Sequence, residues 1–130
     1  MGIVTSVLSP FVPKPFTPLQ WASMAPEEEL ALREEEVGAS LRAVPNMRVS
    51  ASNPWDAIVQ GYLGLSDRRA AAGLRSARAG KLPRSTPGLA GALASIVFRE
   101  KGGREFLPWD VIDGGLRKDA LRARYDAFFR

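Results

Sequence analysis

The chain has 130 residues with 45% hydrophobic content and a formal net charge of +4, and it contains neither cysteine nor histidine. This length and composition predict one modest domain with its own core rather than a disordered chain. Without thiolate or imidazole, these residues offer no such ligands for iron, zinc or copper. The sequence has no run of about 20 apolar residues that would span a bilayer, and we expect a cytoplasmic protein.

An extended segment opens the chain. Residues 3–9 predict a strand, which runs into four prolines between residues 10 and 18. Each proline fixes its own φ and holds the preceding residue extended, so this segment predicts a stiff loop. Such a loop can lie over a pocket at a strand end, but the residues alone favour a structural arm that packs Phe11, Phe16 and Trp21 on the core.

A helix and a second strand follow. Pro26 and the three glutamates at 27–29 indicate a helix start, and Pro45 indicates its end. Residues 48–51 predict a weak strand. Strand, helix and strand in this order form a βαβ unit, which is the repeat of a partial barrel.

From residue 53 onward the apolar spacing is helical. Start signals predict four helices, beginning at Asn53–Pro54, at Ser66, at Thr86–Pro87 and after Gly114–Gly115. The second helix is expected to run toward Gly80, and the third to end by Gly102–Gly103. The predicted fold class is therefore α/β and mostly helical: a barrel-end βαβ segment with a Pro-rich loop over residues 1–52, then a helical bundle over residues 53–130, as one compact unit.

Two carboxylates near the C-terminus are three residues apart. Asp110 and Asp113 could share one face of a helical turn, as general acid–base chemistry sometimes needs. Capping of local backbone N–H groups is the simpler use. We assign no catalytic and no metal-binding residue to this chain.

Basic residues gather between residues 66 and 84, where one acid, Asp67, accompanies Arg68, Arg69, Arg75, Arg78, Lys81 and Arg84. Such a surface could bind RNA or DNA phosphates in a salt-dependent, sequence-independent way, or it could serve only solubility. No zinc finger, glycine-rich phosphate loop or aromatic RNA-binding signature accompanies it. A stand-alone basic domain that binds nucleic acid is the alternative function.

Three stretches resemble the radical S-adenosylmethionine (SAM) enzymes, in the branch that often carries a cobalamin-binding domain. Residues 9–18 with Gln20 and Trp21 match a Ser-Pro-Phe-Val-Pro-Lys-Pro-x-Thr-Pro-x-Gln-Trp pattern that follows a barrel strand. The later stretches occur in the same order as in that family: Asn53-Pro54-Trp55 with Asp67-Arg68-Arg69, and Leu107-Pro108-Trp109-Asp110 with Ile112, Asp113, Gly115, Lys118, Leu121 and Tyr125. The match departs at Ser66, where glycine is frequent, and at Arg124, where an acid is frequent.

The resemblance implies that the chain is the C-terminal part of such an enzyme, inactive alone, which closes the barrel and shapes the cofactor and substrate pocket. It implies cofactor contacts from Ser9, Pro10, Phe11, Val12 and Lys14, and it implies that Gln20 and Trp21 border the substrate or brace the loop. The four-iron four-sulfur cluster of the family needs cysteine thiolates. The implied partner is therefore a cysteine-bearing N-terminal segment that binds the cluster and SAM, with cobalamin as a further candidate cofactor.

The expected state of the isolated chain follows from its first strand. With its outer edge unpaired, this strand could pair with another copy of the chain.

Overall fold

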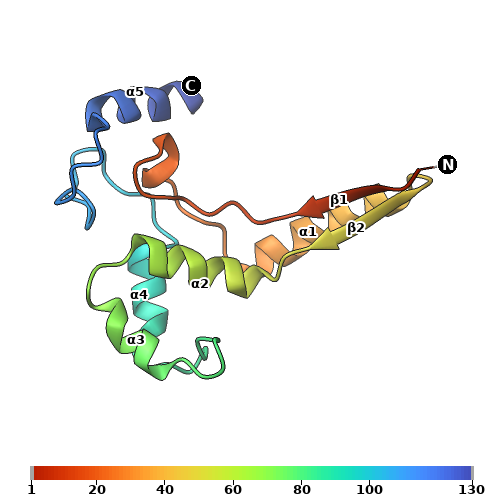
Figure 1. The fold of residues 1–130 in the computed structure, drawn as a ribbon, viewed down its shortest axis with the longest axis horizontal. Helices are drawn as coiled ribbons and strands as arrows, with labels where there is room; N and C mark the ends of the chain where they lie inside the picture. Colours follow the sequence, from red (N-terminus) through yellow and green to blue (C-terminus); the bar gives the residue numbers. More distant parts are fainter. Residues whose placement is uncertain (1, 130) are drawn as a thin grey trace.

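The computed structural model describes residues 2–129 and shows an elongated βαβ arm joined to a helical body (Figure 1). The arm consists of β1 (Val4–Leu8), α1 (Glu27–Arg42) and β2 (Met47–Ala51). The body contains the 3-10 helix η1 (Pro18–Trp21), α2 (Pro54–Leu65), α3 (Ala70–Ser76), α4 (Leu89–Ile96) and α5 (Lys118–Phe128). The predicted α/β class and the predicted βαβ order are confirmed.

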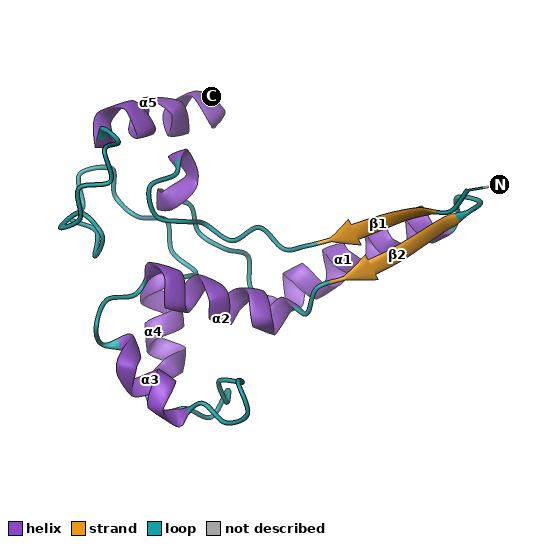
Figure 2. Ribbon diagram, viewed as in Figure 1, coloured by secondary structure: helices purple, strands orange, loops and turns teal. Residues whose placement is uncertain are grey.

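The sheet of the arm has two parallel strands. β1 pairs with β2 in a register that runs from Val4 opposite Met47 to Leu8 opposite Ala51. α1 lies against one face of the sheet (Figure 2). The other face carries exposed side chains from alternate positions: Thr5, Val7, Arg48 and Ser50. Within residues 2–129, no further strand pairs with either outer edge.

The Pro-rich segment leaves the arm and enters the body. Its residues form neither helix nor strand as far as residue 14, as the prolines predict, and a turn at residues 15–17 then precedes η1, which begins at Pro18. Thr17 Oγ1 donates a hydrogen bond to the Lys14 carbonyl at 2.8 Å, and Phe16 adopts a positive φ of 59°. This turn directs the chain into η1, which packs against α5.

Two apolar clusters form the core of the body. The first joins α2 and α4 through Ile58, Tyr62, Leu93 and Val97. The second joins η1, α5 and the loop between α4 and α5, and its buried members are Trp21, Ala22, Leu65, Leu107, Trp109, Leu121 and Tyr125. The predicted contact of Trp21 with the core is confirmed, and Phe16 packs partly buried against this second cluster. The predicted packing of Phe11 on the core is wrong, because 46% of the surface of Phe11 is exposed.

Several helix boundaries differ from the prediction. α3 ends at Ser76, short of Gly80, and α5 begins at Lys118, three residues after Gly115. Two helix starts differ for reasons that the structure shows. α3 begins at Ala70 and not at Ser66, because the Asp67 carboxylate caps the preceding turn by accepting the Arg69 N–H at 2.8 Å. α4 begins at Leu89 and not at Thr86–Pro87, because Gly88 adopts a positive φ of 75° and interrupts the helical path. No helix within residues 2–129 is long and apolar enough to cross a membrane.

The start of α2 offers a direct test of its cap. The Asn53 side chain accepts the Trp55 N–H at 2.8 Å, and loss of such a cap typically costs about 1 kcal/mol. We therefore expect Asn53→Ala to lower the free energy of unfolding of the chain by about 1 kcal/mol in urea denaturation. Asn53→Asp retains an acceptor and should stay within about 0.3 kcal/mol of the unsubstituted chain; equal losses in the two variants would contradict the cap.

Candidate functional site

A hollow lies where the two strands end. β1 and β2 run in the same direction, and both carboxyl ends point toward the helical body (Figure 1). Between these ends and the start of α2 is a hollow of about 560 Å³, here named the strand-end hollow. It is lined by Ser9, Pro10, Val12, Ser52, Asn53, Asp56, Ala57 and Gln60.

The strand-end hollow presents several polar groups. Ser9 Oγ and Ser52 Oγ share a hydrogen bond of 3.2 Å across the ends of β1 and β2. Asp56 and Gln60 lie four residues apart on α2, and both are exposed, so their side chains lie on one face of the helix. Hydroxyl, carboxylate and amide groups can hydrogen-bond the hydroxyls of a sugar or the nitrogens of a heterocycle.

The five residues predicted to contact a cofactor do not share one pocket. Ser9, Pro10 and Val12 line the strand-end hollow. Lys14 lines a separate groove of about 490 Å³, together with Phe11, Val12, Thr17, Pro18, Leu19, Arg124 and Phe128. Ser9, Pro10 and Phe11 also line a third depression of about 660 Å³, between the Pro-rich segment and α1. The loop thus contributes to three depressions, and Val12 borders the first two.

The two residues predicted to border the substrate are buried. Gln20 Oε1 accepts the Phe16 N–H at 3.2 Å and the Trp109 Nε1–H at 2.6 Å. The Trp21 ring is fully buried, with its centroid 5.7 Å from that of Tyr125 in an edge-to-face contact. Both side chains therefore brace the Pro-rich segment against the body, while a contact with substrate stays a prediction.

The carboxylates of Asp110 and Asp113 hold turns. Asp110 Oδ2 accepts the Leu107 N–H at 2.8 Å and forms an ion pair with Lys118. Asp113 Oδ1 accepts the Gly115 N–H at 2.9 Å. The capping use is confirmed, and each carboxylate has a structural partner.

The basic residues of the alternative function lie in the turn before α3, in α3 itself and in the loop that follows it. Arg69 is paired with Asp67, and Arg84 is paired with Glu27 while its guanidinium lies 4.4 Å from the centre of the Trp55 ring. The other four are exposed and have no ion pair with an acid inside residues 2–129: Arg68, Arg75, Arg78 and Lys81. Nucleic-acid binding by these six residues stays a prediction.

The structure adds three polar residues to the site that the sequence interpretation missed. Ser52, Asp56 and Gln60 line the strand-end hollow. The available signal was the i, i+4 spacing of Asp56 and Gln60 directly after the second strand, because residues that follow a parallel strand lie at the pocket edge of the sheet.

The residues of this chain fit one part of the implied cofactor set and not another. The polar groups of the strand-end hollow fit the ribose and adenine of SAM, which need several hydrogen-bond donors and acceptors. An iron–sulfur cluster does not fit, because the sequence has no cysteine. In the described part of the chain, no group of three or more acidic side chains could hold a metal ion.

Comparison of the chain with protein-family models, with curated proteins and with solved structures gave no significant match.

Proposed function

We propose that this chain is the C-terminal part of a radical SAM iron–sulfur oxidoreductase, inactive by itself, which closes the partial barrel and shapes the cofactor and substrate pocket. The observation that carries the proposal is the two-stranded parallel sheet of the arm, whose outer edges pair with no other strand among residues 2–129. Parallel sheets are ordinarily buried on both faces, and two strands alone are marginal. The arm is therefore best explained as the end of a larger sheet.

The faces of the arm support this reading. α1 lies on one face, as the helices of a barrel lie outside its strands. The opposite face, with Thr5, Val7, Arg48 and Ser50, would then turn toward the barrel interior. Ile3 and Val7 are each 65% exposed in this chain, and a preceding strand that paired with β1 would cover such apolar surface.

The strand-end hollow lies where barrel enzymes bind their ligands, at the carboxyl ends of the strands. When bound beside its cluster on the cysteine-bearing segment, SAM supplies the radical chemistry. In the proposed enzyme the residues of this chain only bind and orient it. Asp56 and Gln60 would hydrogen-bond the ribose, and the backbone of residues 9–12 would help to hold the adenosine. Lys14 would bind an anionic group in the adjoining groove, where part of a cobalamin is a candidate.

The first test is the identity of the natural gene product. An antibody raised against residues 2–129 is used to capture it from its source cells, and its intact mass and iron content are measured. We expect a polypeptide several times longer than these 130 residues, carrying iron and cleaving SAM under reducing conditions. A product that matches these 130 residues and holds no iron would overturn the proposal.

The second test addresses the strand-end hollow in that product. We expect Asp56→Asn combined with Gln60→Ala to raise the KM for SAM about tenfold, because two hydrogen bonds to the ligand are lost. Glu36→Gln removes the same charge from an exposed position of α1 and should leave the KM unchanged. Equal KM values in the double variant and the unsubstituted enzyme would show that the strand-end hollow does not bind SAM.

The alternative function rests on four exposed basic residues that form no ion pair with a described acid: Arg68, Arg75, Arg78 and Lys81. If the natural product is the short chain, we expect it to bind RNA with an affinity that falls steeply as salt is raised. Sedimentation of the isolated chain tests a third outcome, self-association. A dimer would indicate that the outer edge of β1 pairs with a second copy of the chain.

A further inference from the structure

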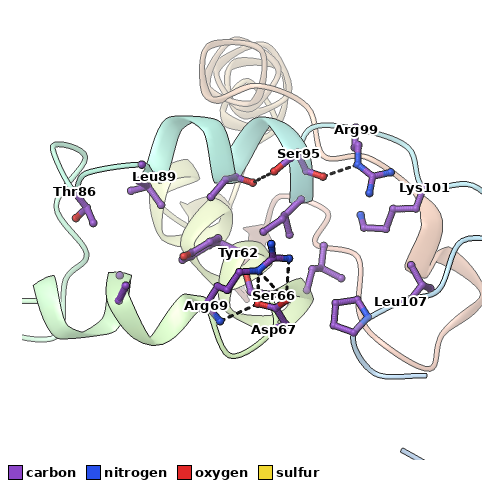
Figure 3. Close-up of a pocket in the computed structure, with 18 of the residues that line it drawn as sticks. Tyr62, Ser66, Asp67, Arg69, Thr86, Leu89, Ser95, Arg99, Lys101 and Leu107 are labelled. Atoms are coloured by element: carbon purple, nitrogen blue, oxygen red, sulfur yellow. Dashed lines mark hydrogen bonds and ion pairs between the residues drawn. The ribbon is translucent and has the colours of Figure 1, made fainter. Parts of the chain in front are cut away.

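A cleft in the helical body holds a buried lysine. The cleft has a volume of about 530 Å³ and lies between the end of α2, the start of α3, α4 and the loop over residues 99–108 (Figure 3). Lys101 reaches into this cleft from the loop, and only 4% of its surface is exposed. Its backbone N–H donates to the Trp21 carbonyl at 2.8 Å, which fixes the residue beside η1. We name this space the Lys101 cleft.

The charges of the Lys101 cleft do not balance. Arg69 is paired with Asp67. Arg99 is paired with Glu105. Among the described residues that line the cleft, these two pairs cancel and the Lys101 ammonium remains as one uncompensated positive charge. Its Nζ has no hydrogen-bond partner within residues 2–129.

A second buried donor lines the same cleft. Ser66 Oγ is also buried without a hydrogen-bond partner among the described residues. Buried polar groups are nearly always hydrogen-bonded, because an unpaired donor loses its water and gains nothing. An ammonium and a hydroxyl that share one cleft and both lack an acceptor therefore indicate a ligand that supplies acceptor atoms.

The titration of Lys101 agrees with this geometry. Burial, together with the positive charge of Arg99, lowers the pKa of Lys101 to about 8. Glu105 acts in the opposite direction but is itself paired with Arg99. At neutral pH the side chain remains mostly protonated and can attract an anion.

We propose that the Lys101 cleft binds a small organic carboxylate with an apolar body, whose carboxylate accepts hydrogen bonds from the Lys101 ammonium and the Ser66 hydroxyl. One uncompensated positive charge matches a single negative charge, whereas a phosphate monoester carries close to two. The walls beside the polar groups are apolar and include Leu65, Leu107 and Ile96. The volume is within the range of small-molecule sites, about 300 to 1,000 Å³.

The test compares carboxylates with their neutral amides on this chain. Benzoate and 4-phenylbutyrate are titrated by calorimetry beside benzamide and 4-phenylbutanamide. We expect the carboxylates to bind at least about tenfold more tightly than the amides. In parallel, the pKa of Lys101 is followed by NMR of its εCH₂ group. It should rise from about 8 toward its ordinary value with either carboxylate and stay unchanged with the amides.

Two variants and a control complete the test. Lys101→Met should weaken carboxylate binding at least about tenfold and Ser66→Ala about three- to tenfold, whereas Lys81→Met, at an exposed lysine, should have no effect. Equal binding of acid and amide, unaltered binding by Lys101→Met, or absence of binding at millimolar concentrations would overturn the proposal. Tighter binding of inorganic phosphate than of both carboxylates would also overturn it.

Discussion

Replacement of Gln20 by leucine is expected to destabilise the chain by about 2 to 4 kcal/mol. Only 2% of Gln20 is exposed, and its Oε1 accepts hydrogen bonds from the Phe16 N–H and the Trp109 Nε1–H. Leucine has a similar volume but no acceptor. Two donors would then be left in the protein interior, each costing about 1 to 3 kcal/mol when unpaired.

Urea denaturation of the full chain at pH 7 measures this loss. The chain offers a matched control, because its second glutamine, Gln60, is exposed. Gln60→Leu should change the free energy of unfolding by less than about 0.5 kcal/mol. A Gln20→Leu chain as stable as the Gln60→Leu chain would show that the buried amide does not hold the Pro-rich segment.

A double-mutant cycle isolates the bond to Trp109. In the Gln20→Leu chain the Trp109 Nε1–H has lost its acceptor. Trp109→Phe removes this unpaired donor, so the substitution relieves a cost in that background. We expect the substitution to cost about 1 to 2 kcal/mol less in that background than in the unsubstituted chain. Strict additivity of the two changes would contradict a direct coupling of Gln20 with Trp109.

The βαβ arm could be predicted because its signals are local. The prolines of the loop after β1, the glutamates at 27–29 and Pro45 each constrain their own stretch of backbone. The boundaries of α3 and α4 depended on competition between neighbouring signals. The Asp67 carboxylate holds the turn that precedes α3, where Ser66 was predicted as the helix cap, and the positive φ of Gly88 delays the start of α4 beyond Thr86.

The site was predicted only in part, because its parts meet through tertiary packing. Ser9, Pro10 and Val12 came from the resemblance of the Pro-rich segment, and they do line the strand-end hollow. Asp56 and Gln60 join them only because the start of α2 lies beside the ends of the strands in the folded chain. Their i, i+4 spacing directly after the second strand was the only signal in the sequence, and the solvent-exposed face of an ordinary amphipathic helix has the same spacing.

The burial of Lys101 could not be predicted from the sequence either. In the sequence Lys101 is one of 18 lysines and arginines, and such residues are almost never fully buried unless paired. Its burial follows from the docking of its loop, through the hydrogen bond of its backbone N–H to the Trp21 carbonyl. The covalent neighbours of Lys101 carry no information about that contact, so only the folded chain reveals the unpaired ammonium.

The stability of the chain should record this burial as a dependence on pH. Burial lowers the pKa of Lys101 from 10.5 to about 8. Between these two values the unfolded chain binds more protons than the folded chain, so this lysine makes stability rise with pH across that window. Below about pH 8 the lysine is charged in both states, and its burial lowers the free energy of unfolding by the full amount. A difference of this size corresponds to about 3 kcal/mol, since one pKa unit is about 1.4 kcal/mol.

Lys101→Met is therefore expected to raise the free energy of unfolding at pH 7 by about 2 to 3 kcal/mol, and the gain should shrink as the pH rises from 8 to 10. The measurement uses urea denaturation in buffers free of carboxylates, so that no ligand offsets the charge. It stops near pH 10 because burial raises the pKa of Tyr125 to about 12, which makes stability fall at higher pH. Lys81→Met should show neither the gain nor its pH dependence. A Lys101→Met chain that is no more stable than the unsubstituted chain at pH 7 would mean that the ammonium already has water or a partner in the cleft.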